Sequence, residues 1–215
     1  MIRVLLIDDH AMIREGCRRV LEAAGDVAVI GQAGSAEEGL TLARNLRPDV
    51  VVLDLRLPGM SGLEATERLL AACEGLRILV LSMIDQLPMP TRLIQAGASG
   101  YLTKDAPAEE LVRAVREVAQ GRSYLCQRVA SDMALGQLRN GGRSSPVEQL
   151  TSRELEVALR LATGACNRDI AQQLHISEKT VSTHKTRVLE KLGVASTVAL
   201  ASMLVSHGLV VPDRL

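Results

Sequence analysis

Short apolar runs alternate with longer amphipathic stretches through the first 120 residues of the chain. The runs lie at residues 4–7, 27–30, 50–53, 78–81 and 100–102, and none alternates between apolar and polar positions. Such runs are typical of strands that are buried on both faces of a parallel sheet. Five repeats of a strand followed by a helical pattern predict a doubly wound α/β domain with a five-stranded parallel sheet.

The helical stretches carry recognisable start signals. Ser35, Ser61 and Thr151 each precede a glutamate by three positions, which is the capping-box pattern at the start of a helix. Pro107 favours the start of the fifth helix. Pro88 and Pro90 lie where the fourth helix should begin, so we expect that helix to start late, around Pro90, after an ordered loop.

The second half of the chain has no strand pattern. Residues 122–139 look helical, and the segment Asn-Gly-Gly-Arg-Ser-Ser-Pro at 140–146 is typical of a flexible linker. Four helices are predicted near 152–162, 167–174, 178–192 and 196–207. We therefore expect three parts: an α/β domain at 1–121, a linker with a helix and a flexible segment at 122–149, and a small all-α domain at 150–215.

Composition limits the classes of function. The chain has no Trp, no Phe and two Tyr, so its cores must be aliphatic and a ligand pocket lined by aromatic rings is disfavoured. The 25 basic and 25 acidic residues cancel, so net charge indicates no partner. Four widely spaced cysteines without metal-site spacing favour reduced thiols. With no signal-peptide pattern and no apolar run long enough for a bilayer, we expect a cytoplasmic protein without membrane contact.

Acidic residues follow two of the predicted strands. Asp8 and Asp9 end the first strand, and Asp54 ends the third, which lies beside the first in a sheet of this type. Three converging carboxylates repel one another, and a hard divalent cation relieves that repulsion. We expect Mg²⁺ bound directly by Asp9, Asp54 and the Arg56 carbonyl, with Asp8 acting mostly through water.

A carboxylate in such a site can attack phosphorus and form an acyl phosphate. The cation would neutralise charge on the phosphoryl oxygens, the ammonium group of Lys104 would pair with another oxygen, and the Ser82 hydroxyl would hydrogen-bond the phosphate. Taken singly, paired aspartates at a strand end are more often turn or cap residues, and a lone lysine is more often a solvated surface residue. The joint arrangement is what favours the chemical interpretation.

The motifs Ile7-Asp8-Asp9-His10, Leu53-Asp54 through Gly62, Leu81-Ser82 and Gly100 through Lys104 resemble the receiver-domain signature over residues 1–120. The resemblance implies a flavodoxin-like fold and phosphorylation of Asp54 by a sensor histidine kinase. It also implies that Ser82 and Tyr101 move together as a switch pair.

The predicted helix at 178–192 has two different faces. The side chains expected to point inward are apolar, namely Val181, Val188, Leu189 and Leu192, and the opposite face is polar and basic. That layout is typical of a DNA recognition helix, although charged faces on helices are usually only solvated. The preceding short helix and turn supply the helix-turn-helix spacing that favours DNA binding.

The segments at 150–157, 167–171, 176–184 and 190–192 resemble the LuxR-type helix-turn-helix, and with the receiver they indicate the NarL/FixJ family of response regulators. The stretches at 90–97 and 177–183 are similar to the GacA/UvrY-type subgroup. The resemblance implies bases facing Ser182, Thr183 and Thr186. It implies backbone contacts for Thr180, His184, Lys185 and Arg187. The basic pattern of the helix face adds Lys179 as a further candidate for phosphate contact. Many relatives carry Lys or Arg at position 182, so Ser182 leaves the operator sequence open.

The expected function is therefore a two-component response regulator. Phosphorylation of Asp54 would promote homodimer formation, with the helix near 196–207 as a candidate contact, and binding to promoter DNA, with RNA polymerase as a candidate further partner. We expect no enzymatic activity beyond intrinsic autodephosphorylation.

Three other functions remain open from the sequence. A phosphotransferase or phosphatase using Asp54 commonly needs an acid two residues later, and position 56 is Arg. A ligand-gated transcription factor is disfavoured by the few aromatic residues. A receiver that works without phosphorylation usually lacks one of the acids or the lysine, and all of them are present here.

Overall fold

The chain divides into two compact units, Met1–Met133 and Ala134–Leu215, in a computed structural model. The structure describes residues 1–55, 57, 60–83, 89–140, 146–174, 176–206 and 210. The division falls within helix α6 (Gln127–Asn140), inside the segment that was predicted to be helical.

A parallel sheet forms the centre of the first unit, with the strand order β2-β1-β3-β4-β5-β6. The strands are β1 (Ile2–Ile7), β2 (Val27–Ala33), β3 (Val50–Leu53), β4 (Arg77–Ser82), β5 (Gly100–Thr103) and β6 (Tyr124–Leu125). The five apolar runs all lie in strands, which confirms the predicted α/β class. The predicted number of five strands is wrong, because β6 pairs with Gly100 and Tyr101 and adds a sixth. Two residues are too short to give a recognisable run. They lie in the segment 122–139 that was predicted to be helical, and that prediction is wrong for its first part, because helix α6 begins only at Gln127.

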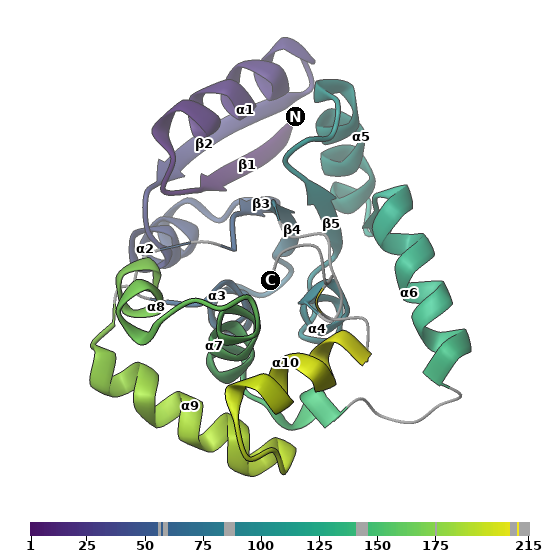
Figure 1. Ribbon diagram of the computed structural model, residues 1–215. Helices are drawn as coiled ribbons and strands as arrows, with labels where there is room; N and C mark the ends of the chain where they lie inside the picture. The colour runs from purple at the N-terminus through teal and green to yellow at the C-terminus, as the bar shows by residue number, and fades with distance from the viewer. Residues whose placement is uncertain are drawn as a thin grey trace. The chain divides into compact units, whose positions relative to one another are not determined.

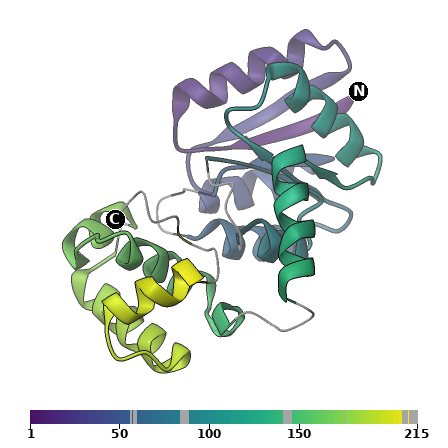
Figure 2. The same ribbon diagram turned by 45° about the vertical axis from the view of Figure 1, so that its right-hand side comes forward.

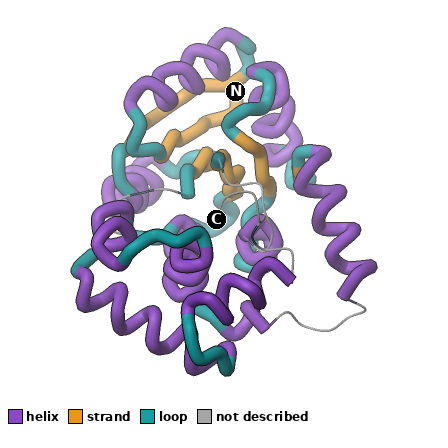
Figure 3. The backbone as a smooth tube through the Cα atoms, in the orientation of Figure 1, coloured by secondary structure: helices purple, strands orange, loops and turns teal. Residues whose placement is uncertain are grey.

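Helices cover both faces of this sheet. Helices α1 (Ala11–Ala23) and α5 (Ala108–Ala119) lie together over one face, and α2 (Ala36–Leu46), α3 (Gly62–Ala72) and α4 (Met89–Gln95) lie over the other (Figures 1 and 3). The central strands are buried between the two layers, and the Val50, Val51 and Leu53 side chains are fully buried. The uninterrupted apolar runs are therefore explained by burial on both sides.

The predicted helix starts are largely confirmed. The hydroxyls of Ser35 and Ser61 accept hydrogen bonds from the third residue of α2 and α3, respectively. Helix α5 begins directly after Pro107. Helix α4 begins at Met89, one residue before the expected position, while the predicted loop with Pro88 lies outside the described residues.

The second unit is helical in its described part (Figure 2). It contains a short 3₁₀ turn (Pro146–Gln149) and helices α7 (Ser152–Ala162), α8 (Asn167–Gln173), α9 (Glu178–Leu192) and α10 (Thr197–Ser206). Helix α7 packs against α9 and α10, and α8 packs against α9. Thr151 and Glu154 form a complete capping box at the start of α7. All four helices match their predicted ranges closely, and most of the predicted flexible segment, residues 141–145, lies outside the described residues.

Over the described residues, no single helix combines the length and hydrophobicity of a membrane span. Helix Glu178–Leu192 and residues Thr197–Val205, with a bend of 58° between them, meet the length and composition criteria only when they are taken together.

Close packing of α2 on β1 predicts opposite effects for two glycine substitutions. A Cβ atom at Gly39 would overlap the buried side chain of Ile7, whereas Gly16 is exposed on α1 and has nothing within 4 Å of the added atom. Gly39→Ala should lower the free energy of unfolding by about 1–2 kcal/mol through overpacking. Gly16→Ala should raise it by up to about 1 kcal/mol through helix propensity. Urea unfolding followed by far-ultraviolet circular dichroism checks both, and equal effects of the two changes would contradict the packing argument.

Candidate functional site

Two aspartates lie side by side where neighbouring strands end. Strands β1 and β3 pair with Ile7 opposite Leu53, and the backbone N–H of Asp54 donates to the Ile7 carbonyl at 2.8 Å. This register places Asp8 and Asp54 at the same edge of the sheet, and both are nearly buried, with exposed fractions of 6% and 3%. The predicted convergence of carboxylates at the carboxyl ends of the strands is thus present in the structure.

Lys104 completes this pair of charges. It follows β5, and its backbone N–H donates to the Ser82 carbonyl at 2.9 Å. Its ammonium nitrogen lies 2.6 Å from Oδ2 of Asp8 and 2.7 Å from Oδ2 of Asp54. Burial alone would lower the pKa of Lys104, but the hydrogen bonds and negative charges of Asp54 and Asp8 outweigh burial and raise it above its ordinary value. The lysine is therefore a cation held between two buried carboxylates.

The acidic cluster also includes Asp9 and His10. One ligand atom from each of Asp8, Asp9, His10 and Asp54 can be chosen so that all four lie within 4.8 Å of one another. The Nδ1 atom of His10 lies 2.7 Å from Oδ1 of Asp9 and 3.3 Å from Oδ1 of Asp8. Three carboxylates against one lysine leave excess negative charge, and oxygen donors are the ligands that a hard cation prefers. The donor set therefore fits Mg²⁺, while the predicted carbonyl ligand, Arg56, lies outside the described residues.

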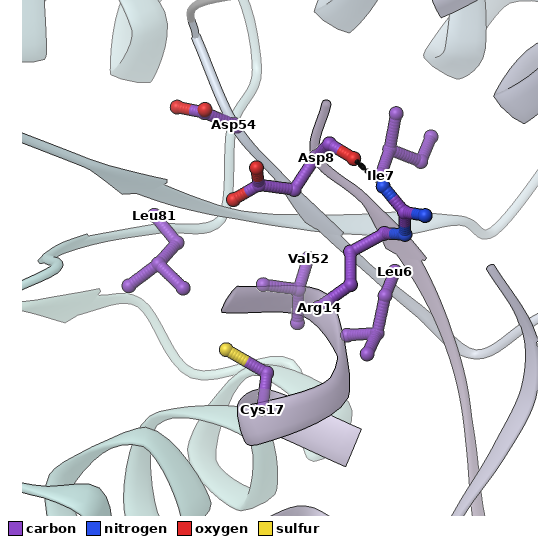
Figure 4. A pocket seen from close by; sticks show the side chains of 8 residues that line it. All are labelled: Leu6, Ile7, Asp8, Arg14, Cys17, Val52, Asp54 and Leu81. Carbon is purple, nitrogen blue, oxygen red and sulfur yellow. Dashed lines mark hydrogen bonds between the residues drawn. The ribbon is translucent and has the colours of Figure 1, made fainter. Parts of the chain in front are cut away.

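A small cavity lies beneath these carboxylates (Figure 4). Its lining is partly aliphatic, from β1, β3 and β4, and includes Cys17 and Arg14 of α1. The Arg14 guanidinium donates to the backbone carbonyl of Asp8, as the dashed line in Figure 4 shows. Burial and the nearby charge of Asp8 raise the pKa of the Cys17 thiol, so it stays protonated. Cys17 therefore acts in the lining of this cavity as a small apolar residue.

The predicted switch residues are both completely buried. Ser82 ends β4 and pairs with Thr103 of β5, and Tyr101 lies in the middle of the same strand pair opposite Val80. The pairing of β4 with β5 therefore connects Ser82 to the segment that carries both Tyr101 and Lys104.

Helix α9 carries all the predicted DNA-contacting residues. Most of their side chains are exposed on one surface, namely Lys179, Thr180, Ser182, Thr183, Thr186 and Arg187, whereas His184 and Lys185 are partly buried. The apolar residues Val181, Val188 and Leu192 are buried, as the two-faced pattern predicted, whereas Leu189, which was also expected to point inward, is only partly buried. Ser177 accepts a hydrogen bond from the backbone N–H of Thr180 and caps the helix.

His184 differs from its neighbours on the helix. Burial and the nearby positive charge of Arg153 lower its pKa, so the imidazole is held in its neutral form. Within the described part of the chain, its buried Nδ1 atom has no hydrogen-bond partner. Its position against α7 sets it apart from the exposed cationic side chains of α9.

An ion pair that sequence reasoning did not identify holds α9 against α7. The Lys191 ammonium nitrogen lies 2.7 Å from Oε2 of Glu154, a residue that is only 2% exposed, and donates to the Gln149 carbonyl at 3.3 Å. Burial would raise the pKa of Glu154, but Lys191 and the Thr151 backbone N–H outweigh burial and lower it. The capping motif at Thr151 was visible in the sequence, but the partner 37 residues away was not.

Residues near the acidic site were also missed. His10 follows the two aspartates directly, so its place in the motif was the available signal. Arg14 lies four residues beyond His10, one turn into α1, and only the tertiary arrangement shows that it binds the Asp8 carbonyl.

Two family models match the chain. Residues 4–116 match the response regulator receiver domain, and residues 148–204 match the bacterial regulatory proteins of the luxR family. The first match runs from β1 into α5, and the second runs from the 3₁₀ turn into α10.

Relatives match over nearly the whole length. The chain is 42% identical to the response regulator GacA of Pseudomonas aeruginosa, covering 98% of both proteins, and 37% identical to the response regulator UvrY of Escherichia coli K12, covering 97% of this chain and 96% of UvrY. It also resembles a solved structure of RcsB from Salmonella enterica serovar Typhimurium bound to promoter rprA in the presence of the phosphomimetic BeF₃⁻. That likeness has a TM-score of 0.65 and 25% identity, and it covers 95% of this chain and 98% of RcsB.

The Lys104 ion pairs predict a pH-dependent loss of stability on substitution. Lys104→Gln leaves Asp8 and Asp54 without their cation, so the free energy of unfolding should fall by about 3 kcal/mol at pH 7 in a chelating buffer. Because the folded-state pKa of Lys104 lies above 10.5, wild type should keep this advantage below about pH 10 and lose it as the pH rises through that pKa. Urea unfolding across this range measures the difference.

The matched control is Arg68→Gln, which removes an exposed ion pair with Glu64 on α3. It should change the free energy of unfolding by less than about 0.5 kcal/mol. If the free energy of unfolding differed between wild type and Lys104→Gln by the same amount at pH 7 and at pH 12, the ammonium charge would not be the cause of the difference.

Proposed function

Since the chain belongs to the NarL/FixJ family of response regulators, which join a receiver domain to a LuxR-type DNA-binding domain and control transcription, we propose that Asp54 accepts a phosphoryl group from a sensor histidine kinase. The observation that carries this proposal is the buried arrangement of Lys104 between Asp8 and Asp54, beside Asp9. A purely structural ion pair would not need a third carboxylate at the same edge of the sheet.

The proposed chemistry uses the side chains in distinct roles. An oxygen of Asp54 attacks phosphorus, the bond from phosphorus to the kinase histidine nitrogen breaks, and an acyl phosphate forms. Lys104 then exchanges its contact with Asp54 for one with a phosphoryl oxygen, so its charge stays compensated. Asp8, Asp9, Asp54 and the backbone carbonyl of Arg56 would hold Mg²⁺. When bound, Mg²⁺ neutralises negative charge on the phosphoryl oxygens.

The signal would leave the site through Ser82 and Tyr101. The Ser82 hydroxyl would hydrogen-bond the new phosphoryl group, and Tyr101 would take the inward position, which is also the position it has in this structure. The backbone bond from Lys104 to Ser82 supports a coupled movement of β4 and β5. Such a switch changes the face of the domain formed by α4, β5 and α5.

The proposed output is sequence-specific binding of promoter DNA by a phosphorylated homodimer. Ser182, Thr183 and Thr186 would face bases, and Lys179, Thr180, His184, Lys185 and Arg187 would face the backbone. Support comes from the exposed polar surface of α9 and from the similar RcsB, whose solved structure is bound to a promoter in the presence of a phosphomimetic. Helix α10 is the proposed dimer contact, and RNA polymerase is a further proposed partner.

The remaining assignments follow from the same proposal. Residues 1–121 would act as the receiver, 122–149 as the linker and 150–215 as the DNA-binding domain of a cytoplasmic protein. The only enzymatic step that we propose is the slow hydrolysis of its own acyl phosphate.

Removal of the acceptor tests the phosphorylation proposal. Asp54→Ala should abolish the increase in DNA binding that a small acyl phosphate produces in the full chain, because no oxygen remains to form the acyl phosphate. Asp105→Ala is the matched control, since Asp105 is an exposed acid one residue after Lys104. Binding to promoter fragments measured by gel shift, with and without acyl phosphate, checks both variants. Full stimulation of Asp54→Ala would rule out Asp54 as the acceptor.

The magnesium proposal has its own test. Asp9→Asn removes one negative charge from the cluster without changing its size, so Mg²⁺ affinity should fall at least about tenfold. Isothermal titration of the unphosphorylated full chain with MgCl₂ gives the affinity directly. Asp105→Asn should bind Mg²⁺ as wild type does, and unchanged affinity in Asp9→Asn would remove Asp9 from the proposed site.

A further inference from the structure

Three of the exposed hydroxyl groups on α9 belong to the residues that are proposed to face bases, Ser182, Thr183 and Thr186. A hydroxyl has one proton to donate and two lone pairs that accept. A DNA base edge presents a fixed pattern of donors and acceptors in the major groove. The contacts that each hydroxyl already makes within the protein therefore decide which base atoms it can bind.

Both threonines have already donated their proton. Thr183 Oγ1 lies 3.0 Å from the Lys179 carbonyl oxygen, and Thr186 Oγ1 lies 3.1 Å from the Ser182 carbonyl oxygen, each one turn back along the helix. A carbonyl oxygen can only accept, so the direction of both bonds is certain. Toward a base, Thr183 and Thr186 can therefore act only as acceptors.

Ser182 has the opposite polarity. Its Oγ atom accepts a hydrogen bond from Nδ2 of Asn167, at 3.1 Å, across the contact between α8 and α9. An amide nitrogen can only donate, so this bond uses a lone pair of Ser182 and leaves its proton available. Among the described residues no acceptor for that proton is present. Unlike its two neighbours, Ser182 therefore points a donor outward.

We propose that Asn167, on the helix before the recognition helix, determines base preference by holding Ser182 as a hydrogen-bond donor. Asn167 is a positioning residue here, because it acts through Ser182. The exposed surface of α9 then presents one hydrogen-bond donor, Ser182, and two acceptors, Thr183 and Thr186. This inference rests on the proposed contact between α9 and the major groove.

The pattern selects base atoms. Acceptors in the major groove are N7 and O6 of guanine, N7 of adenine and O4 of thymine, whereas cytosine offers only the N4 donor. Ser182 should therefore reject cytosine at the base that it contacts. Thr183 and Thr186 should favour the amino groups of adenine or cytosine. Phosphates carry no protons, so these two threonine hydroxyls are not phosphate ligands, and that role falls to the cationic side chains of α9.

Reversal of one hydrogen bond tests the proposal. Asn167→Asp keeps the size of the side chain but allows it only to accept, so it should take the Ser182 proton and turn Ser182 into an acceptor. Selection of bound sequences from a random double-stranded DNA pool, with the full chain treated with acyl phosphate, reports the base preference at each position. The Ser182→Ala variant shows which base position Ser182 contacts, because the base preference at that position should disappear when the hydroxyl is removed.

At that position, Asn167→Asp should shift relative binding toward adenine and cytosine by roughly three- to tenfold, which is the effect of one hydrogen bond. Gln172→Glu makes the same amide-to-carboxylate change on an exposed part of α8 and is the charge control. Gln172→Glu should weaken binding to all DNA sequences by the same factor and leave the preferred sequence unchanged, because added negative charge opposes every phosphate contact.

The outcomes separate this inference from the proposed function. If wild type enriches no common sequence, the proposed DNA contact of α9 is wrong. If wild type enriches a sequence and Asn167→Asp enriches the same one with the same preferences, Asn167 does not set the polarity of Ser182. A loss of all preference in Asn167→Asp alone would also overturn the inference, since it requires a change at one base position.

Discussion

Two carboxylates buried within 2.7 Å of one ammonium group are the constraint on which the receiver depends. Lys104 supplies the positive charge that this buried pair of acidic side chains needs, because an unpaired buried charge is strongly unfavourable. The sheet register brings the three side chains together from β1, β3 and the end of β5. The same register buries the aliphatic runs of the core, so folding and assembly of the acidic site are one process.

This arrangement also explains why the site suits phosphoryl transfer. Lys104 compensates carboxylate charge before any ligand arrives, and its backbone is tied to Ser82 on the neighbouring strand. In the proposed reaction, a new phosphoryl group would compete with the Asp54 carboxylate for the same ammonium. The balance of charge at this edge of the sheet is therefore connected to the buried strand pair that contains Tyr101.

The sequence predicted most of the fold because the responsible patterns are local. Strands buried on both faces read as apolar runs, and the hydroxyls of Ser35, Ser61 and Thr151 begin helices through contacts three residues away. Strand β6 was missed because two residues carry no periodicity and their pairing is set by β5. Likewise, the motifs indicated the acids and the lysine of the site. The Asn167 bond to Ser182 depends on how α8 crosses α9, which no spacing in the sequence specifies.

The scarcity of aromatic residues, first noted as a limit on ligand pockets, gives the protein an internal spectroscopic label. With no Trp and no Phe, near-ultraviolet absorption comes almost entirely from two tyrosines, and both lie in the first unit. Tyr101 is fully buried in β5, while the Tyr124 hydroxyl donates a hydrogen bond to Glu110 and accepts one from Arg113. Changes in tyrosine absorption or near-ultraviolet dichroism on phosphorylation would thus report on the first unit alone, without any attached dye, because helices α7 to α10 contain no tyrosine, tryptophan or phenylalanine.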